Sequence, residues 1–253
     1  MDLAGTVVAA GSEVTRLKPG DEVFGSGRGT YAEYAAASSD MVSLKPAALS
    51  FAQAAAIPVS AVTALQGLRK AGRIEPGQQV LITGASGGVG SYAIQMAKAL
   101  GAEVTGLSSA GKFDFVRSLG ADHLIDYRKT GFPRASRGYD VILDIAGNPS
   151  LRSLRSALTQ NGTAVIGGGE EGGTLTGGIG RQLGAVMLSP FIRQRLAMFL
   201  GLVRAADLEE LARMIDDGQL VPALDRTFPL DQAQLALRSL EAGEVRGKVA
   251  ITL

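Results

Sequence analysis

Short apolar runs alternate with segments of helical spacing between residues 79 and 169. The apolar runs are QVLIT, EVTGL, DHLID, YDVILDIAG and TAVIGGG, and the helical segments are VGSYAIQMAKALG, KFDFVRSLG and LRSLRSAL. Apolar strands that alternate with helices are typical of a parallel sheet covered on both faces. The pattern therefore predicts an α/β fold for this part of the chain.

The first part of the chain has a different pattern. AGTVVAAG and YAEYAAA predict short strands, and Pro19 and Gly20 between them fit a type II turn. We expect a small β unit here.

Helices are predicted in three further places. Ser50 and Gln53 form the capping box of a helix, which Pro58 separates from a second one. Residues 188–203 have helical spacing, and residues 206–253 predict a helix, a strand, a helix and a final strand. We expect the last segment to return to the first, β-rich unit.

Composition and charge narrow the function classes. The formal net charge is +1 without a block of like charges, which argues against a nucleic acid or an anionic membrane as partner. No apolar run approaches the roughly 18 residues of a membrane-spanning helix. The chain has no cysteine, so it contains neither a disulfide nor a thiolate metal site, which fits a reducing, cytoplasmic location. We expect a small-molecule partner.

The glycine-rich segment TGASGGVG, residues 83–90, fits two motifs. One is the TGxxxGxG pattern of short-chain dehydrogenases. Those enzymes carry it in their first strand and use a tyrosine with a lysine four residues later. None of the five tyrosines of this chain has such a lysine. We therefore reject this interpretation.

The second motif is a variant of G-x-G-x-x-G that starts with Ala85. It follows the strand QVLIT and opens a helix, which is the context that a dinucleotide site requires. Gly87 lets the backbone approach a diphosphate, and Gly90 lets the helix pack against the strand. Free N–H groups at the helix start attract the phosphates. The predicted diphosphate-binding residues are Ser86, Gly87, Gly88, Val89 and Gly90. A tight turn without a ligand is the alternative.

This motif is accompanied by a set of further matching segments. They are KPGDEVFG, GTYAEYAA, AAAIPVSAVTAL, LGADHLIDYRK and RGKVAITL. Over nearly its whole length the chain resembles the zinc-independent medium-chain dehydrogenase/reductases that are quinone oxidoreductase-like. The resemblance implies a Rossmann doubly wound parallel sheet plus a partial GroES-like β domain. The implied domains are residues 1–55 (partial GroES-like catalytic domain), 56–205 (Rossmann NADP-binding domain) and 206–253 (C-terminal return to the catalytic domain).

The resemblance implies an NADPH-dependent, metal-free reductase that transfers hydride to a quinone, an enone or a related carbonyl compound. The cofactor would supply the hydride, and the protein would supply orientation and a dry cleft. No proton donor is identified, so the catalytic residues stay unknown. An NADPH-binding sensor or structural protein with little or no turnover is the alternative.

The end of the segment EVTGL bears on the choice of cofactor. A site for NAD usually ends this strand with a carboxylate that binds the ribose 2′-hydroxyl. Here Ser108 and Ser109 follow instead. In NADPH-using relatives a lysine here and a tyrosine fifteen residues later hold the 2′-phosphate, and Lys112 and Tyr127 match that spacing. The resemblance therefore implies NADP(H); the alternative is a solvated lysine and a surface tyrosine.

The zinc ligands of related dehydrogenases have no counterpart. The segment that matches their G-H-E motif is Met1-Asp2, and Ala56 and Pro58 stand near the place of a third ligand. The single histidine, His123, is expected to be structural. We therefore expect no metal site.

Several further cofactor contacts are predicted. Asn148, Gly167 and Gly168 follow strands at their carboxyl ends, where ligands bind in open α/β sheets. Resemblance also places Thr63 and Lys248 near the cofactor. The alternatives are a plain turn for Asn148, a bond to a helix carbonyl for Thr63 and a solvated strand end for Lys248.

Residues 167–178 contain seven glycines, which predicts either a mobile loop over the cleft or an ordinary flexible connection. Beyond it, Phe191, Leu196, Phe199 and Leu200 are candidates for a substrate pocket, for the contact of a homodimer, or for the core.

The start of the chain, residues 1–5, resembles an interior position of the family's catalytic domain. We expect that earlier strands are missing, so that cofactor binding survives and catalysis is weak. The alternative is a shortened member whose strands are covered by a partner subunit.

Overall fold

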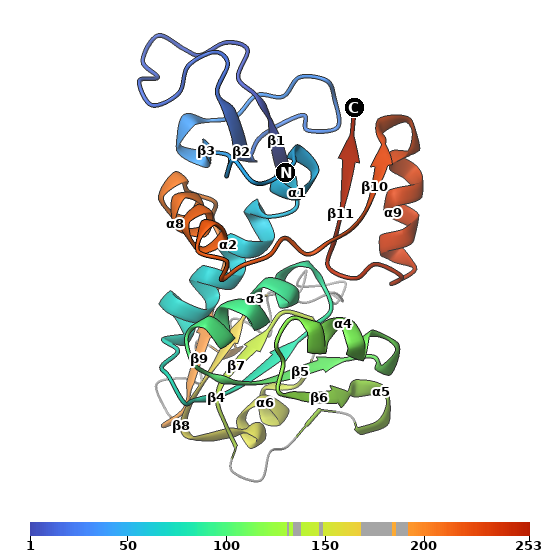
Figure 1. Ribbon diagram of the computed structural model, residues 1–253. Coiled ribbons are helices and arrows are strands. Elements are labelled where there is room, and N and C mark those ends of the chain that lie inside the picture. Colours follow the sequence, from blue (N-terminus) through green and yellow to red (C-terminus); the bar gives the residue numbers. More distant parts are fainter. Residues whose placement is uncertain (131, 134–137, 147–148, 168–183, 186–191) are drawn as a thin grey trace. The chain divides into compact units, whose positions relative to one another are not determined.

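The computed structural model describes residues 1–253 except 131, 134–137, 147–148, 168–183 and 186–191 (Figure 1). Contacts within the chain divide it into two units. The first unit consists of Met1–Thr63 and Leu202–Leu253, and the second unit is Ala64–Gly201. The predicted domain boundaries, after residues 55 and 205, stay a prediction.

The second unit contains a six-stranded sheet whose strands are all parallel. Its strands are β4 (Gln79–Thr83), β5 (Glu103–Ser108), β6 (His123–Asp126), β7 (Tyr139–Asp144), β8 (Leu158–Ile166) and β9 (Arg195–Met198). They lie in the order β6-β5-β4-β7-β8-β9. This is the doubly wound Rossmann order, in which the chain reverses direction between the first and fourth strands. The predicted α/β fold is confirmed, and the reversal lies between β4 and β7.

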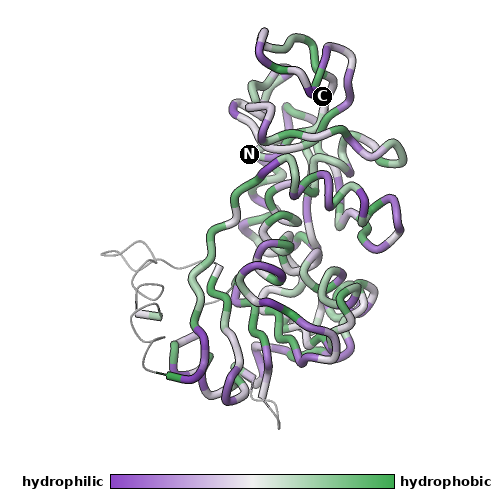
Figure 2. The backbone as a smooth tube through the Cα atoms, turned by 90° about the vertical axis from the view of Figure 1, so that its left-hand side faces the viewer, coloured by the Kyte–Doolittle hydropathy of each residue, from purple (hydrophilic) through white to green (hydrophobic). Residues whose placement is uncertain are grey.

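Helices cover this sheet as the sequence predicts. They are η2 (Gly67–Gly72), α3 (Gly88–Ala99), η3 (Ala110–Lys112), α4 (Phe113–Ser118), α5 (Tyr127–Thr130) and α6 (Leu151–Ala157). Helix α3 contacts β4 and β5, α4 contacts β5 and β6, α6 contacts β8, and η2 contacts β7, β8 and β9. Figure 2 shows hydrophobic colour along much of this sheet, in keeping with strands that are covered on both faces.

The strand β9 corrects one prediction. Residues 188–203 were expected to form a helix, but the described part, from residue 192 onward, contains the strand Arg195–Met198. It pairs with β8, and its Leu196 is buried. Apolar residues in a short segment fit either element, and the free edge of β8 decides between them.

The first unit contains two small sheets. Strands β1 (Asp2–Thr6), β2 (Glu22–Ser26) and β3 (Val42–Leu44) are antiparallel, and β10 (Leu224–Pro229) and β11 (Lys248–Thr252) are parallel. Its helices are η1 (Ser39–Met41), α1 (Phe51–Ala55), α8 (Ala205–Asp216), η5 (Leu230–Gln232) and α9 (Ala233–Glu241), and α2 (Pro58–Gln66) crosses the boundary between the units after Thr63. Helix α1 contacts β1 and β11, and α8 contacts β3. The N-terminal sheet and the C-terminal segment thus share one unit.

Local signals in the first unit are confirmed in part. Gly20 has φ of 93° and Asp21 N donates to Lys18 O at 3.1 Å, as a type II turn requires. Ser50 and Gln53 form both bonds of the capping box. The strand YAEYAAA was wrong, because residues 31–37 contribute only an isolated bridge to the described structure. Their side chains are exposed and meet no partner strand.

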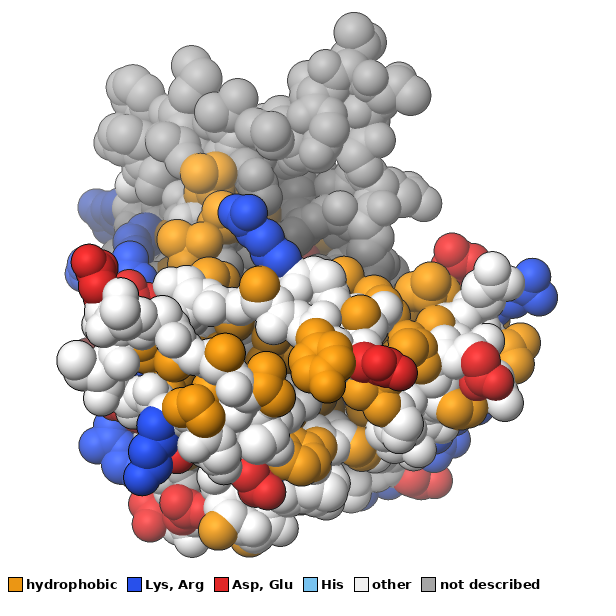
Figure 3. Space-filling model, turned by 90° about the horizontal axis from the view of Figure 1, so that it is seen from above, with side chains coloured by type: hydrophobic (Ala, Val, Ile, Leu, Met, Phe, Trp, Pro, Cys, Tyr) orange, Lys and Arg blue, Asp and Glu red, His pale blue; other side chains and the backbone are white. Residues whose placement is uncertain are grey.

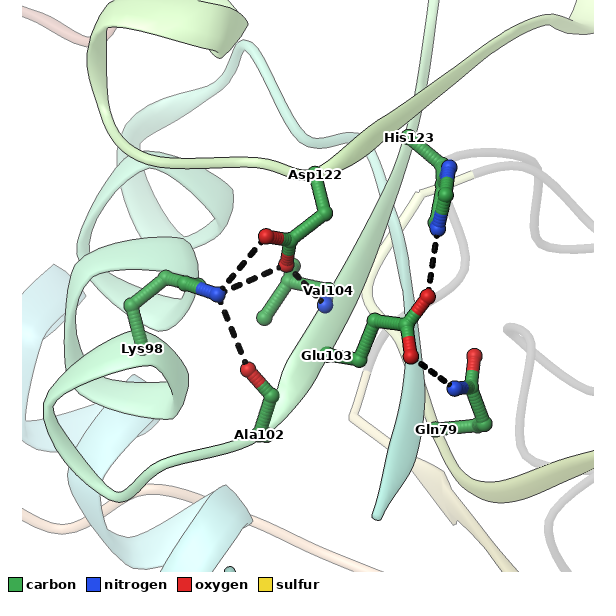
Figure 4. Close-up of polar contacts among 7 residues, drawn as sticks. All are labelled: Gln79, Lys98, Ala102, Glu103, Val104, Asp122 and His123. Carbon is green, nitrogen blue, oxygen red and sulfur yellow. Dashed lines mark hydrogen bonds and ion pairs between the residues drawn. The ribbon is translucent and has the colours of Figure 1, made fainter. Parts of the chain in front are cut away.

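Polar side chains meet at the amino ends of the parallel strands (Figure 4). His123 Nε2 lies 2.6 Å from Glu103 Oε1, and Gln79 Nε2 donates to Glu103 Oε2. The bonds to His123 and Gln79 lower the pKa of Glu103. His123 thus begins β6 at the end of the sheet opposite the glycine turn, which fits the structural role expected for it.

A second contact in this region joins α3 to the sheet. Lys98 Nζ lies 2.8 Å from both carboxylate oxygens of Asp122, and Val104 N donates to Asp122 Oδ2 at 2.7 Å (Figure 4). Burial alone would raise the pKa of Asp122, but the bonds from Lys98 and Val104 lower it overall. The ionised carboxylate therefore stabilises the folded state.

Asp122→Asn should make the free energy of unfolding depend less on pH in the acidic range. Because the folded pKa lies below the ordinary value of 3.8, the carboxylate stabilises the fold above that pH and loses its effect as the pH falls through the folded pKa. Urea unfolding at about pH 3 and about pH 7 measures this. The variant should lose stability mainly at the higher pH. Asp114→Asn, whose side chain is 99% exposed, is the control; an equal loss there would contradict the prediction.

Candidate functional site

The glycine turn lies at the carboxyl end of β4. Gly84 follows the strand with φ of 60°, and Gly87 N donates to Gly84 O at 2.9 Å. Gly87 is the N-cap of α3 and makes no side-chain cap hydrogen bond. The first N–H groups of a helix have no partner within it, so this end attracts an anion. Gly88 and Val89 are the first two helical residues, as predicted.

Gly90 lies where α3 crosses the end of β4. A Cβ atom built on it would lie 2.2 Å from Gly84 O and 2.8 Å from Ala85 Cα. Gly106 on β5 has a similar constraint, since its Cβ would lie 2.7 Å from Val116 Cγ1. The close approach of helix and strand therefore depends on glycine at position 90, as the sequence motif predicts.

The residues predicted to hold a 2′-phosphate lie at the same edge of the sheet. Ser108 ends β5 and is the register partner of Asp126, which ends β6. Lys112 is half-buried in the turn after Ser109, and Tyr127 begins α5 directly after Asp126. The parallel register therefore brings the segment after β5 and the segment after β6 to the same end of the sheet. Tyr127 is 49% exposed.

Asp126 is a carboxylate at this edge that the sequence analysis did not single out. Its Oδ1 accepts from Arg128 N at 3.0 Å, and the Arg128 guanidinium lies 5.8 Å from the centre of the Tyr127 ring. The carboxylate of Asp126 therefore bonds to the start of α5, and the positive charge of Arg128 lies beside the ring of Tyr127. The strand-ending pattern HLID followed by YR was the available signal.

A buried pair of side chains joins the ends of β4 and β7. Thr83 Oγ1 lies 3.2 Å from Asp144 Oδ1, and both residues are almost completely buried. Gly167 N, after β8, donates to Asp144 O at 3.0 Å. The sequence analysis did not name Thr83 or Asp144 as site residues, although both polar residues end apolar strands.

In the first unit, Asp2 joins three segments. Its Oδ1 accepts from Val59 N at 2.8 Å, near the start of α2, and its Oδ2 lies 2.9 Å from Lys248 Nζ on β11. Thr63 Oγ1 donates to Val59 O at 2.6 Å. Lys248 is therefore in an ion pair rather than a solvated strand end, and Thr63 makes the bond to a helix carbonyl that was its alternative interpretation. Whether either residue also contacts a cofactor stays a prediction.

The remaining candidates for cofactor contacts and for a substrate pocket lie in different surroundings. Asn148, Gly168 and Phe191 lie outside the described residues, as does the glycine-rich stretch after Gly167. Leu196 belongs to the core cluster of the second unit. Phe199 is half-buried, and its ring lies 3.7 Å from the Cβ position of Gly67 and from that of Gly167. Leu200 is 76% exposed.

The donor set does not fit a catalytic zinc site. Zinc in proteins is bound mainly by cysteine and histidine, with carboxylates as further ligands. The chain has no cysteine, and its histidine pairs with Glu103 at the amino ends of the strands. In the part of the chain that the structure describes, no group of three histidine, aspartate or glutamate residues is arranged to hold a metal ion.

The surface drawn in Figure 3 is mixed in character. Figure 3 shows one face on which hydrophobic side chains are spread among uncharged surface, with most charged side chains toward the edge. This face does not show a broad patch of one charge sign. Among the described residues, no helix has the length and hydropathy needed to span a membrane.

Comparison with known proteins agrees with this architecture. Residues 119–251 match the family described as zinc-binding dehydrogenase, and residues 1–47 match the alcohol dehydrogenase GroES-like domain. The chain is 32% identical to the mitochondrial NAD(P)H oxidoreductase RTN4IP1 of Bos taurus, over 100% of this chain and 69% of the relative. It is 35% identical to 2-methylene-furan-3-one reductase of Solanum lycopersicum, over 99% of this chain and 62% of the relative. The chain thus spans about two thirds of the length of these relatives.

A solved structure of an oxidoreductase is also similar to this chain. The quinone oxidoreductase from Coxiella burnetii superposes with a TM-score of 0.86 at 32% identity, covering 100% of this chain and 78% of that one. Because the zinc-binding dehydrogenase match covers more than half of the residues and the GroES-like match precedes it, the chain belongs to the medium-chain dehydrogenase/reductase family, among quinone oxidoreductase-like relatives.

Proposed function

We propose that this chain is a zinc-independent, NADPH-dependent oxidoreductase that transfers hydride to a quinone, an enone or a related carbonyl compound. The observation that carries the proposal is the glycine turn from Gly84 to Gly90, which lies at the carboxyl end of β4 beside the reversal of strand order. Ligands of doubly wound sheets bind in the crevice at that reversal. The uncapped start of α3 would hold the diphosphate.

The preference for NADPH rests on the edge formed by β5 and β6. Ser108 and Ser109 stand where an NAD site usually has a carboxylate. We propose that Lys112 and Tyr127 bind the 2′-phosphate by charge-assisted and hydroxyl hydrogen bonds. Asp126 already accepts a bond from Arg128 N, which restrains its carboxylate at this edge.

The substrate class is supported by the relatives. One is named a furanone reductase, another an NAD(P)H oxidoreductase, and the Coxiella burnetii structure a quinone oxidoreductase. When bound, the nicotinamide supplies the hydride. The residues of this chain would orient it, and the proton that completes the reduction would come from water. The proposal keeps the cofactor contacts predicted from the sequence, which are Thr63, Asn148, Gly167, Gly168 and Lys248.

Steady-state oxidation of NADPH tests the proposal. The purified chain is incubated with NADPH and a panel of quinones, enones and aldehydes, and titrations measure the binding of NADPH and NADH. Turnover of at least one acceptor well above the rate without protein is expected, with NADPH bound about tenfold more tightly than NADH. Binding without turnover would favour a sensor or structural protein. Failure to bind either nucleotide would exclude both functions.

A further inference from the structure

Thr83 and Asp144 lie at the reversal of strand order in the second unit. Thr83 is the last residue of β4, and Asp144 is the last residue of β7, the neighbouring strand. The crevice of a doubly wound sheet opens at this point. The pair therefore stands at the base of the proposed cofactor site, between the glycine turn and the segment that follows β7.

The hydrogen bonds of Thr83 define the direction of its hydroxyl. Oγ1 accepts from Ile145 N at 2.9 Å and from Ala146 N at 3.1 Å. A threonine hydroxyl has two acceptor positions and one donor hydrogen. With both acceptor positions filled, the hydrogen points to Asp144 Oδ1, 3.2 Å away. Thr83 thus holds the two residues that follow β7 and is itself fully bonded.

The same contact brings the two loops close together. Gly84, directly after Thr83, packs against Ala146 so closely that a Cβ on Gly84 would lie 2.5 Å from Ala146 Cβ. The backbone oxygen of Asp144 also accepts from Gly167 N at 3.0 Å. Three strand ends are therefore tied together at one place, and each leads into a segment with proposed cofactor contacts.

Burial of the pair indicates that it has a geometric role. Thr83 is 1% exposed and Asp144 is 0% exposed. Burying a hydroxyl and a carboxyl group is costly unless they are hydrogen-bonded, and well-packed apolar residues often give equal or greater stability at such sites. A hydroxyl at position 83 does what an apolar side chain cannot, because it binds two backbone N–H groups of the next strand end.

We propose that Thr83 and Asp144 form a positioning pair that sets the distance between the glycine turn and the segment after β7, so that one bound dinucleotide contacts both. This inference rests on the proposed function. The pair acts through the backbone of residues 145–146 and needs no contact of its own with the cofactor.

Thr83→Val tests the pair, because valine keeps the shape of threonine and removes the hydroxyl. The dissociation constant of NADPH should rise about tenfold or more. A change of this size corresponds to the loss of one to two hydrogen bonds, here those that hold residues 145–146 in place. Thr83→Ser, which keeps the hydroxyl, should stay within about threefold of the wild type. Hydrogen exchange at Ile145 N and Ala146 N should be about tenfold faster in Thr83→Val without any cofactor present.

Thr105→Val is the matched control. Thr105 is a buried threonine in the middle of β5, and its hydroxyl bonds to Tyr139. This variant should lose stability without a change in NADPH affinity or in exchange at residues 145 and 146. If Thr83→Val does not fold, Asp144→Leu carries the same test with a smaller rise in the dissociation constant, because leucine is close to aspartate in shape and removes the oxygen that accepts from Thr83 Oγ1.

The outcomes separate this inference from the proposed function. A wild-type chain that does not bind NADPH refutes the proposed function, and the exchange measurement still tests whether the pair holds residues 145–146. A wild-type chain that binds NADPH, with Thr83→Val unchanged in affinity or no different from Thr105→Val, overturns the positioning role.

Discussion

Replacement of Gly90 by alanine should lower NADPH affinity about a hundredfold and destabilise the second unit by about 3 kcal/mol. The added Cβ would lie 2.2 Å from Gly84 O and 2.8 Å from Ala85 Cα. Both atoms belong to the backbone, so a rotamer change cannot relieve the contact. Alanine favours a helix over glycine by only about 1 kcal/mol, which does not offset the overlap. Urea unfolding and a fluorescence titration with NADPH measure the two effects.

Gly11→Ala is the control for this substitution. Gly11 lies in an exposed loop, and the nearest atom to its Cβ position is Val14 Cγ2 at 4.0 Å. This variant should keep the stability and the NADPH affinity of the wild type. If Gly90→Ala behaved in the same way, α3 would have room to move away from β4, and the close approach would not be needed for binding.

Lys112→Ala should raise the dissociation constant of NADPH by about ten- to a hundredfold and leave that of NADH nearly unchanged. The expected loss is a charge-assisted hydrogen bond, which contributes roughly 1.5–3 kcal/mol. The two cofactors differ only in the 2′-phosphate, so their ratio isolates this contact. Calorimetric titration of both cofactors gives the ratio directly.

Lys129→Ala distinguishes a specific contact from a general effect of positive charge. Lys129 is an exposed residue of α5, two positions after Tyr127. Its replacement should change NADPH affinity by no more than about threefold, as expected for a solvent-screened charge. An equal loss in both variants would mean that the 2′-phosphate responds only to the local charge, and an equal loss of NADH affinity would remove the phosphate assignment.

Local signals predicted the sheet well, because each strand is apolar by itself and is bounded by glycine or a polar residue. The segment QVLIT matches the bounds of β4, and the segment LRSLRSAL contains α6. The family resemblance implied a doubly wound sheet, and the structure supplies the order of its strands. These features depend on residues that are close in sequence.

Features that depend on contacts between residues far apart in the sequence were harder to predict. β9 is a strand because the edge of β8 is free to pair with it, and residues 31–37 lack such an edge. The bond between Thr83 and Asp144 joins residues 61 positions apart, and the ion pair of Asp2 with Lys248 joins positions 246 apart. Neither pair has a local pattern, because a single polar residue at a strand end has many possible partners.

The division of the chain also imposes an order on its folding during synthesis. The second unit is one continuous segment, and all its strands have been made by residue 201. The first unit needs residues 202–253, since β11 carries the lysine that binds Asp2. Domains fold as units and N-terminal segments leave the ribosome first. The N-terminal strands β1, β2 and β3 can pair with one another early, but their unit is complete only when residues 202–253 have been made, whereas the Rossmann sheet can already be complete by then.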